Sequence, residues 1–444
     1  MIILTKILQL VMSLSILVII HEFGHFVMAK LFKTRIEKFY LFFDPWFSLF
    51  KYKKGDTEYG IGWLPLGGYV KISGMIDESM DKEQMKQPPQ PHEFRSKTSG
   101  QRLLIMTGGV IFNFISAMLI YVFVLFAWGE TYLPTANVKY GIVTDSVGFE
   151  IGLRNGDKII TVDNQYIEYF QQITADIVLN DRKTIQVERD GEILNIEIPK
   201  DYIPQVIKGK GQISYRTPFQ PMVVNTFTKK SPAKDAGVHI GDKITGIDSI
   251  KFNFSDEFQN YLLSNRTRPV VLNVERKGNM ENIPVTPTAS GFLGFSYAGI
   301  ALNQIFDLKT LKYGFFQSFP AGINKGFKTI ADYLKQFKLI FSRHTKAYES
   351  LGGFITIGSI FPGVWDWQAF WNLTAFLSVI LAIMNILPIP ALDGGHVMFL
   401  LFEVITGRKP SDKFLEYAQI VGMVILFSLL IFANGNDILR LIRK

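Results

Sequence analysis

The apolar stretch ILQLVMSLSILVIIHEFGHFVMA at residues 7–29 decides how this chain must fold. It is long enough to cross a bilayer as a single helix. His21, Glu22 and His25 stand near its end with the spacing H-E-x-x-H. Residues four apart share one face of a helix, so both imidazoles can reach one metal ion while Glu22 stays beside it. Because ionisable side chains are costly at membrane depth, we interpret this cluster as a functional site.

Two plainer interpretations could explain the same stretch. A pair of core histidines bonded to neighbouring helices would explain His21 and His25 without a metal. With only 6 histidines in 444 residues, however, the full H-E-x-x-H spacing rarely arises by chance. A secretory signal peptide would have a shorter apolar region followed by small residues for cleavage, and neither is found. The sequence therefore favours a retained transmembrane helix.

The composition indicates a protein that crosses the membrane several times. Apolar residues make up 48% of the chain, and the mean hydropathy is +0.18. Three further apolar segments qualify as spans: Leu103–Trp128, Phe370–Phe402 and Phe414–Ala433. The chain has no cysteine, so any zinc must be held by His, Asp or Glu.

The net charge of +8 is distributed as expected for a membrane protein rather than for a nucleic-acid-binding one. Lysine and arginine gather in residues 30–102 and, as Arg408, Lys409 and Lys413, just before the last span. The positive-inside rule makes these segments cytoplasmic, which leaves the N-terminus, residues 129–369 and the C-terminus outside. The short basic tail 440–444 points the other way, but it weighs less than the long loop after the first span.

Residues 34–74 carry strand signals, with many aromatic and β-branched side chains and a turn at Lys53–Asp56. Glycine is dense in the second half, where Gly60, Ile61 and Gly62 stand together; glycine lets another backbone approach closely. We expect a small sheet that dips into the membrane near the metal, although an ordinary cytoplasmic hairpin would fit the same pattern. Residues 77–100 are polar and rich in proline, which predicts a linker.

Residues 137–290 contain an internal repeat. The segment 146–159 matches 231–244 at an offset of 85 residues, with Gly152/Gly237, Gly156/Gly241, Asp157/Asp242 and Lys158/Lys243 in register. The pattern resembles PDZ domains in their circularly permuted bacterial form, which capture extended peptides by strand addition. The first copy departs from this pattern, with Val147-Gly148 where Pro-Ala is expected.

Residues 322–343 have the periodicity of an amphipathic helix, with Phe327, Ile330, Leu334, Phe337 and Phe341 on one face. Lysines on the other face suit a helix on the membrane surface, and packing against a domain would suit it equally. The isolated His92, His239 and His344 lie in polar surroundings and are interpreted as surface residues.

The third apolar segment is interrupted by Asn385-Ile386-Leu387-Pro388-Ile389-Pro390-Ala391-Leu392-Asp393-Gly394-Gly395-His396. Its two prolines break the helix, and broken backbone at membrane depth is tolerated where it is buried or lines a polar cavity. A catalytic zinc keeps three protein ligands, and Asp393 is a candidate for the third because zinc ligation would explain a carboxylate at this depth. His396, three residues further on, is the rival candidate.

Together, the H-E-x-x-H motif and N-x-x-P-x-P-x-L-D-G at residues 385–394 resemble the site-2 protease family of intramembrane zinc metalloproteases. The resemblance covers nearly the whole chain. It implies one zinc ion held by His21, His25 and Asp393, with Glu22 as the catalytic base. It also implies that Asn385 lies near the substrate, and that Gly60, Ile61 and Gly62 belong to a membrane-reentrant β-element that engages substrate.

This chain departs from the family pattern at two places, where a proline that is usual in relatives is missing. These are Gly109-Val110-Ile111-Phe112-Asn113-Phe114 in the second span and Leu351-Gly352-Gly353-Phe354.

The expected fold is therefore a multi-pass α-helical membrane protein with about four transmembrane helices, a membrane-associated β-element and two extramembrane PDZ domains of mixed α/β type. The expected order is a first span over 1–30, the β-element and a loop over 31–100, a second span over 101–130, PDZ domains over 137–210 and 211–292, an amphipathic helix and connector over 306–366, a broken span over 368–406 and a last span over 412–434.

The resemblance implies an intramembrane endopeptidase of the bacterial inner membrane that takes part in regulated intramembrane proteolysis. Its substrates would be transmembrane segments of single-pass proteins, such as a pre-trimmed anti-sigma factor or signal-peptide remnants. The active site would lie nearer the cytoplasmic side, and the PDZ domains, outside, would bind a peptide or gate access. Two alternatives remain open: a membrane-tethered PDZ scaffold without catalysis, and a membrane-anchored protease that cuts soluble chains at the surface.

Overall fold

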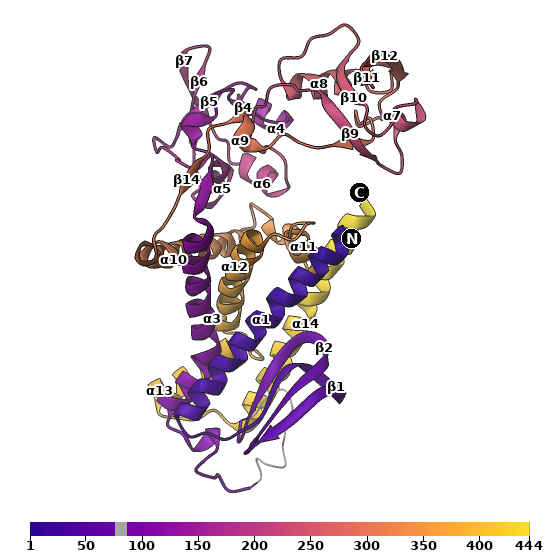
Figure 1. Cartoon of the computed structure of the whole chain (residues 1–444). Coiled ribbons are helices and arrows are strands. Elements are labelled where there is room, and N and C mark those ends of the chain that lie inside the picture. The colour runs from indigo at the N-terminus through magenta and orange to yellow at the C-terminus, as the bar shows by residue number, and fades with distance from the viewer. Residues whose placement is uncertain (76–86, 444) are drawn as a thin grey trace. The chain divides into compact units, whose positions relative to one another are not determined.

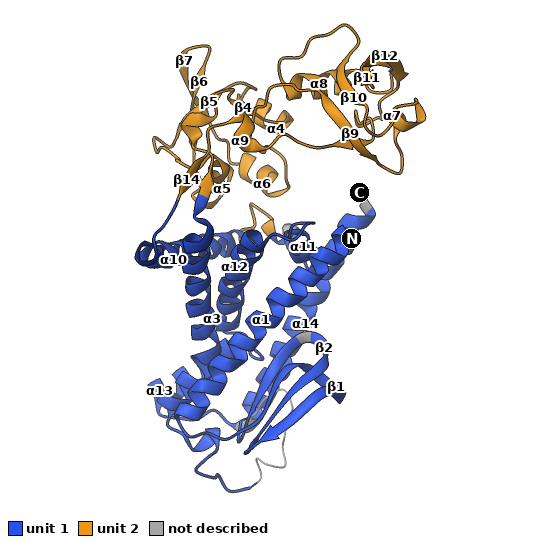
Figure 2. Ribbon diagram, in the orientation of Figure 1, with its two compact units in different colours: residues 1–130, 312–341, 348–444 blue, residues 131–311, 342–347 orange. Residues whose placement is uncertain are grey.

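The structure is a computed structural model that describes residues 1–75 and 87–443. The chain forms two compact units (Figure 2). Unit 1 comprises residues 1–130, 312–341 and 348–444, and unit 2 comprises residues 131–311 and 342–347. Each unit is described by itself. Residues 77–86 of the predicted linker lie outside the described part of the chain.

Among the described residues, four helices of unit 1 are long and apolar enough to cross a membrane, in agreement with the four predicted spans (Figure 1). They are α1 (Ile2–Leu31), α3 (Ser99–Trp128), α12 (Trp367–Ile386) and α14 (Asp412–Arg443). The last helix continues beyond the predicted end at residue 434. Its extra turns include buried Asp437, whose carboxylate accepts hydrogen bonds from the backbone N–H groups of Gly353 and Thr356.

Helix α3 is the centre of unit 1, because α1, α12 and α10 (Phe315–Ile340) all pack against it. Glycines allow the closest approaches: a Cβ on Gly24 would lie 2.3 Å from the carbonyl oxygen of Gly108, so the α1 and α3 backbones touch there. Small hydroxyls add interhelical hydrogen bonds, as Thr374 of α12 donates to Ser13 of α1 over 2.9 Å. Close packing of small residues with polar contacts is typical of helices that associate in a bilayer.

The amphipathic helix expected at 322–343 is α10, which begins earlier, at Phe315. One of its faces packs on α3 through buried Gly322 and Gly326, whose added Cβ atoms would meet Val122 and Met118. Another face leaves Phe319, Ile323, Phe327 and Leu334 exposed. The helix therefore packs on the bundle and also presents an apolar surface outward. A short helix, α11 (Phe354–Ser359), follows it.

The predicted break in the third apolar segment lies between α12, which ends at Ile386, and α13 (Asp393–Thr406). The six residues between them turn sharply, and Ala391 adopts a left-handed conformation with φ of 79°. Leu392 closes the turn by donating its backbone N–H to the carbonyl oxygen of Ile389 over 3.0 Å. The turn places Asp393 in the first turn of α13, where the positive end of the helix dipole favours a carboxylate.

The β-element consists of β1 (Ile36–Lys54) and β2 (Thr57–Ile72), both of which bend and fold back on themselves. Residues 58–61 therefore pair on both sides: Gly60 is opposite both Tyr40 and Lys51, and Ile61 is opposite both Leu41 and Phe50. The second half of β2, residues 64–72, pairs only with residues 36–43 of β1 within the described part of the chain. This second half is an edge strand.

Unit 2 contains the two copies of the repeat, each with a three-stranded antiparallel meander. The first copy has β4 (Ile142–Val143), α4 (Ser146–Glu150), β5 (Lys158–Val162), α5 (Ile173–Leu179), β6 (Thr184–Arg189), β7 (Glu192–Glu197), α6 (Tyr202–Ile207) and β8 (Ser214–Tyr215). The second has β9 (Met222–Phe227), α7 (Pro232–Asp235), β10 (Lys243–Ile247), α8 (Ser255–Ser264), β11 (Val270–Arg276), β12 (Asn279–Val285) and β13 (Phe295–Tyr297). The short elements β3 (Glu130–Tyr132), α9 (Leu302–Ile305) and β14 (Lys309–Leu311) flank them.

The two copies share the same internal contacts. Arg189 binds Asp157 and the carbonyl oxygen of Gly152 in the first copy, and Arg276 binds Asp242 and the carbonyl oxygen of Gly237 in the second. Each copy ends with a strand that pairs back to its own first strand, β8 with β4 and β13 with β9. Each copy therefore includes its closing strand, β8 or β13.

Candidate metal centre

Helix α1 presents both motif histidines on its buried face. The buried positions recur in steps of four residues and are Gln9, Ser13, Leu17, His21, His25 and Ala29, with Gly24 beside them. The relative exposure of His21 is 9% and that of His25 is 6%. The spacing that the sequence analysis assigned to one helical face therefore places both rings inside the bundle.

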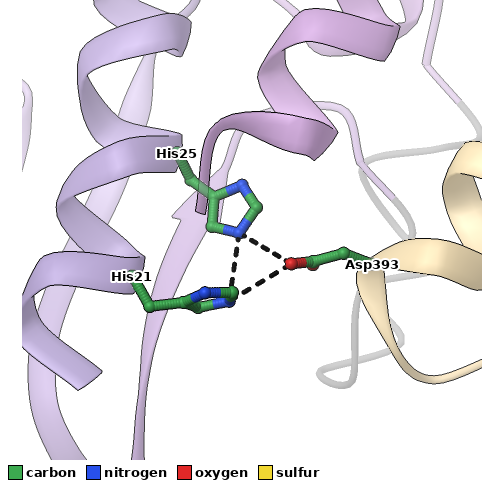
Figure 3. Close-up of side chains that lie close together, drawn as sticks. All are labelled: His21, His25 and Asp393. Atoms are coloured by element: carbon green, nitrogen blue, oxygen red, sulfur yellow. Dashed lines mark hydrogen bonds and ion pairs between the residues drawn. The ribbon is translucent and has the colours of Figure 1, made fainter. Parts of the chain in front are cut away.

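Asp393, at the start of α13, meets the two histidines of α1 (Figure 3). Its Oδ2 atom lies 3.2 Å from Nε2 of His21 and 3.2 Å from Nε2 of His25. The two Nε2 atoms lie 3.4 Å apart. Three potential ligand atoms from opposite ends of the sequence thus form a nearly equilateral triangle, with His25 Nδ1 turned away toward the carbonyl oxygen of Ile105 at 2.9 Å.

The triangle has the size that a tetrahedral zinc ion requires. Zinc–nitrogen bonds of ~2.0–2.1 Å at tetrahedral angles separate neighbouring ligand atoms by about 3.3–3.4 Å. Asp393 Oδ2 is also buried and forms no hydrogen bond within the described residues, although it lies at ion-pair distance from both Nε2 atoms. A buried carboxylate oxygen without a hydrogen bond is costly, and a bound cation would satisfy it. Two imidazoles and one carboxylate are, moreover, a ligand set that catalytic zinc uses.

The turn before α13 determines which of the two candidate third ligands, Asp393 or His396, reaches the histidines. A Cβ on Gly394 would lie 2.1 Å from the carbonyl oxygen of Leu387, so this glycine lets the first turn of α13 fold onto the loop before it. That fold carries Asp393 to the histidines. His396 instead lines a separate pocket that also contains Arg102 and Glu403. Of the two candidates, the structure brings only Asp393 to His21 and His25.

Helix α3 closes the other side of the histidines with a second glycine, Gly109. A Cβ at this position would lie 2.5 Å from Nε2 of His25 and 2.7 Å from Nδ1 of His21. Any larger side chain would therefore occupy the space of the two rings. The sequence analysis noted Gly109 only as part of a segment lacking a proline.

Glu22 lies between the metal-ligand triangle and the edge strand of the β-element. Its side chain is near Gly68, where an added Cβ would come within 3.6 Å of Cγ of Glu22. The Glu22 carboxylate also lies beside the backbone N–H of Val70. The candidate base is thus next to both the two histidines and the main chain of residues 68–70.

The family of the chain is identified by its similarity to known proteins. The sequence model of Peptidase family M50 matches residues 9–429. The chain belongs to peptidase family M50. The resemblance inferred from the two motifs is thereby confirmed.

Several bacterial relatives match this M50 peptidase over nearly their full length. A protein of Haemophilus influenzae named Regulator of sigma E protease is 28% identical, over 97% of this chain and 98% of the relative. RseP of Salmonella typhimurium, named Regulator of sigma-E protease, is 28% identical over the same shares. A protein of Vibrio cholerae that carries the name zinc metalloprotease is 29% identical, over 97% of this chain and 98% of the relative.

Asn385, predicted to lie near the substrate, is in the last turn of α12 and reaches the same centre of the M50 peptidase. Its Nδ2 lies 3.3 Å from Nε2 of His21 and 3.5 Å from Nδ1 of the same ring. An amide donor at this place could bind a carbonyl oxygen next to the metal position.

Gly60, Ile61 and Gly62, expected to engage substrate, lie in the first half of β2. Gly60 and Ile61 pair with β1 on both sides, and Gly62 pairs with Ser48. The reason is that β1 folds back, so that residues 48–54 cover one side and residues 38–41 the other. Added Cβ atoms on Gly60 and Gly62 would strike the Tyr40 ring and the Phe43 carbonyl oxygen, so the glycines serve close packing inside the sheet.

Proposed function

We propose that this chain is an intramembrane zinc endopeptidase that cleaves transmembrane segments of single-pass membrane proteins. The observation that carries the proposal is the triangle of His21 Nε2, His25 Nε2 and Asp393 Oδ2 beside Glu22, inside a bundle of span-length apolar helices. The relatives named zinc metalloprotease and Regulator of sigma E protease support the same activity.

In this proposal, His21, His25 and Asp393 would hold one zinc ion, which would supply a water of lowered pKa and a Lewis acid for the scissile carbonyl. Glu22 takes a proton from the attacking water and delivers it to the leaving amine, since its carboxylate is next to the two ligand histidines. Asn385 donates its amide hydrogen to the carbonyl oxygen of the substrate, where negative charge develops.

The edge strand 64–72 is the proposed support for the substrate main chain. A transmembrane helix hides its peptide bonds, so it has to be unwound before attack. The backbone of residues 68–70 is adjacent to Glu22, and within the described residues it is paired on one side only. Strand addition to this edge would hold an unwound segment by main-chain hydrogen bonds next to the base. Gly60, Ile61 and Gly62 belong to the same strand β2, and we propose that the β-element engages substrate through this strand.

The decisive test is Glu22→Gln in the full-length protein in lipid, with zinc content and cleavage measured together. The variant should keep its zinc, because the ligand set is intact. It should lose cleavage of a membrane-spanning peptide by roughly 10²–10⁴-fold, because proton transfer is removed. A fully active Glu22→Gln enzyme would contradict the proposal. Zinc-loaded wild-type protein that cleaves no membrane peptide would favour a scaffold role, and cleavage sites mapping only outside the bilayer would favour a surface protease.

We further propose that the two repeats are PDZ domains with different roles, and that the second captures a peptide terminus. Its groove lies between α8 and β13 and is lined by Phe258, Leu263, Leu293, Phe295 and Tyr297. Strand β13 ends the sheet order β12-β11-β10-β9-β13, so its outer side is available for strand addition. The apolar lining suits an apolar C-terminal residue, such as one left by trimming of a substrate outside the membrane.

The corresponding region of the first repeat is filled by the chain itself. Between β7 and β8 stands α6, which packs against α5 and has no counterpart in the second repeat. Tyr202 of α6 donates to the carbonyl oxygen of Gly211 over 2.6 Å. The backbone N–H of Gly211 donates to the carboxylate of Asp145 over 2.7 Å, so an internal carboxylate already uses this donor. These contacts favour a gating or spacing role for the first repeat.

Peptide capture can be tested with Leu263→Glu, because Leu263 is already 45% exposed and the change leaves the core intact. The full-length variant should bind a peptide with an apolar C-terminal residue at least about tenfold more weakly in fluorescence anisotropy, since a charge would be buried against the peptide. Ile193→Glu, at an exposed position of the first repeat, is the matched control. Equal binding by all three proteins would argue against a peptide-binding second repeat.

The proposed location is the bacterial inner membrane, with the repeats outside and the metal centre nearer the cytoplasm. Support comes from the four span-length helices and from the lysines and arginines of residues 30–102. Pre-trimmed anti-sigma factors and signal-peptide remnants are the proposed substrates, in keeping with the relatives named Regulator of sigma E protease.

A further inference from the structure

Asn113 is a wholly buried amide in the middle of α3 that the proposed reaction does not use. Its relative exposure is 0%, and its Nδ2 lies 3.1 Å from Nδ1 of His21. Its side-chain oxygen, Oδ1, is buried and makes no hydrogen bond within the described residues. A polar side chain buried at this depth is costly, so an acceptor left without a partner calls for an explanation.

The two ligand histidines differ in what orients them. Both offer Nε2 to the metal position, so each neutral ring must carry its hydrogen on Nδ1 when a metal is bound. For His25, the carbonyl oxygen of Ile105 lies 2.9 Å from Nδ1 and can accept that hydrogen. For His21, the neighbours of Nδ1 are two side-chain amides, Asn113 at 3.1 Å and Asn385 at 3.5 Å.

We infer that Asn113 positions His21 for zinc by accepting the Nδ1 hydrogen through Oδ1. A half-turn of the amide exchanges Nδ2 and Oδ1, which are nearly equal in size, and brings the unpartnered oxygen to the ring. The inference rests on the proposed function, in which His21 is a ligand. Asn113 is a positioning residue, since it reaches the ring nitrogen that faces away from the metal. Asn385, whose amide is nearer Nε2, stays free for the substrate.

The backbone around Asn113 is fixed, as a positioning residue requires. Its carbonyl oxygen accepts hydrogen bonds from Ser378 of α12 over 2.8 Å and from Ser116 over 3.0 Å. One turn earlier, Gly109 leaves the space that the His21 ring fills. The ring is therefore held between a glycine and an amide on one face of α3, and partners of this kind raise the affinity of histidine for metals.

The test measures zinc affinity of the full-length protein in detergent by competition with a chelator, together with the unfolding midpoint of the metal-free protein. Asn113→Leu removes the acceptor and should weaken zinc binding by about 10–100-fold. Asn113→Asp can accept but has no amide hydrogen, so it should bind zinc within a few-fold of wild type. Thr107→Val is the matched control on the same helix, because Thr107 bonds only the carbonyl oxygens of Leu103 and Leu104 in its own helix.

Each outcome bears on the inference. Wild-type affinity in Asn113→Leu, or an equally weak Asn113→Asp, would overturn it. A loss of affinity that merely follows a lower unfolding midpoint without metal would also overturn it, because that result indicates a packing role alone. Should Asn113→Leu not fold, the Asp variant still decides between an acceptor and a donor. Wild-type protein that binds no zinc would contradict the proposed function itself. Failure of the proposed function is thereby distinguished from failure of the inference on Asn113.

Discussion

At the scale of single residues, the proposed metal centre depends on a glycine without a side chain as much as on its ligands. Gly109 is the position where α3 passes the two imidazoles, and an added methyl group would overlap His25 Nε2 at 2.5 Å. Asp393 lies next to both rings, and the carbonyl oxygen of Ile105 lies next to His25 Nδ1. These contacts restrict the movement of the rings away from Gly109. Gly109 is therefore needed for the positions of the two histidine rings, and helix α3 does not need it to form.

Gly109→Ala should weaken zinc binding by at least about tenfold, because the methyl group displaces the rings from the positions that a zinc ion needs. Gly100→Ala is the matched control: the same substitution, in the same helix, where nothing lies within 4 Å of the added Cβ. The control should bind zinc normally, as alanine in place of glycine favours a helix. Zinc titration of both variants checks the prediction, and normal affinity in Gly109→Ala would refute it.

Asp242 links the stability of the second repeat to pH. Hydrogen bonds from Arg276 hold the pKa of the Asp242 carboxyl below its usual range, although burial opposes this. In the unfolded chain the carboxyl takes up a proton at higher pH, so the pair stabilises the fold at neutral pH. This stabilisation is lost as the pH falls below the usual Asp value of ~3.9 and through the lower pKa of the folded state.

Hydrogen exchange of β10 and β11 in the full-length protein, measured with denaturant at several pH values, tests this linkage. Protection should fall on acidification in the wild type. Asp242→Asn should be less protected at neutral pH and should respond less to acid. Asp235→Asn, at an exposed position of the same repeat, should behave like the wild type. An equal acid response in wild type and Asp242→Asn would exclude Asp242 as the cause.

Sequence reasoning found the local part of the site. His21, Glu22 and His25 were predictable because four residues always bring two side chains to one helical face. Spacing could not decide between Asp393 and His396, since the choice depends on how the turn before α13 folds. Gly109 and Asn113 were missed as site residues because their roles depend on which face of α3 meets α1. A single asparagine in an apolar span was the available signal for Asn113.

At the scale of elements, apolar runs predicted the spans well, whereas the β-element was less predictable. Strand propensity located β1 and β2 but not the way that β1 folds back, which depends on long-range pairing. The edge strand at residues 64–72 could therefore not be located from the sequence. The end of α14 was also set too early, because its last turns are stabilised by contacts of Asp437 with residues 353 and 356 rather than by apolar composition.

Helix α14 packs against the loop that leads to Asp393, the proposed third ligand. A Cβ on Gly422 would lie 1.6 Å from the carbonyl oxygen of Pro390, so the α14 backbone rests directly on the loop that leads to Asp393. Gly422→Ala should push this loop aside and lower cleavage by roughly 10²-fold, the effect of an ~1 Å displacement of a catalytic group. Gly435→Ala, with nothing within 4 Å, should cleave normally. Initial cleavage rates of both variants decide the point, and an unimpaired Gly422→Ala would show that α14 gives no such support.

At the scale of the whole molecule, the distribution of charge predicts the orientation in the membrane. Because the chain has no cysteine, single cysteines can report on each side without background. Lys53 of the β-element and Lys277 of the second repeat are both exposed, and the basic segment predicts that they lie on opposite sides.

Intact spheroplasts treated with a membrane-impermeant maleimide should label Lys277→Cys and leave Lys53→Cys unlabelled. Permeabilised cells should label both, which shows that Lys53→Cys is reactive. The reverse pattern in intact cells would invert the proposed topology and place the repeats in the cytoplasm.

The distance along the sequence between the ligands has a consequence for biosynthesis. His21 and His25 are translated long before Asp393, because most of the sequence lies between them. A nascent chain that stops before Asp393 holds two of the three ligands and lacks the loop that completes the triangle. Under the proposed function, the protein stays inert while its early spans are being inserted. Translation then delays the appearance of peptidase activity among newly made membrane segments.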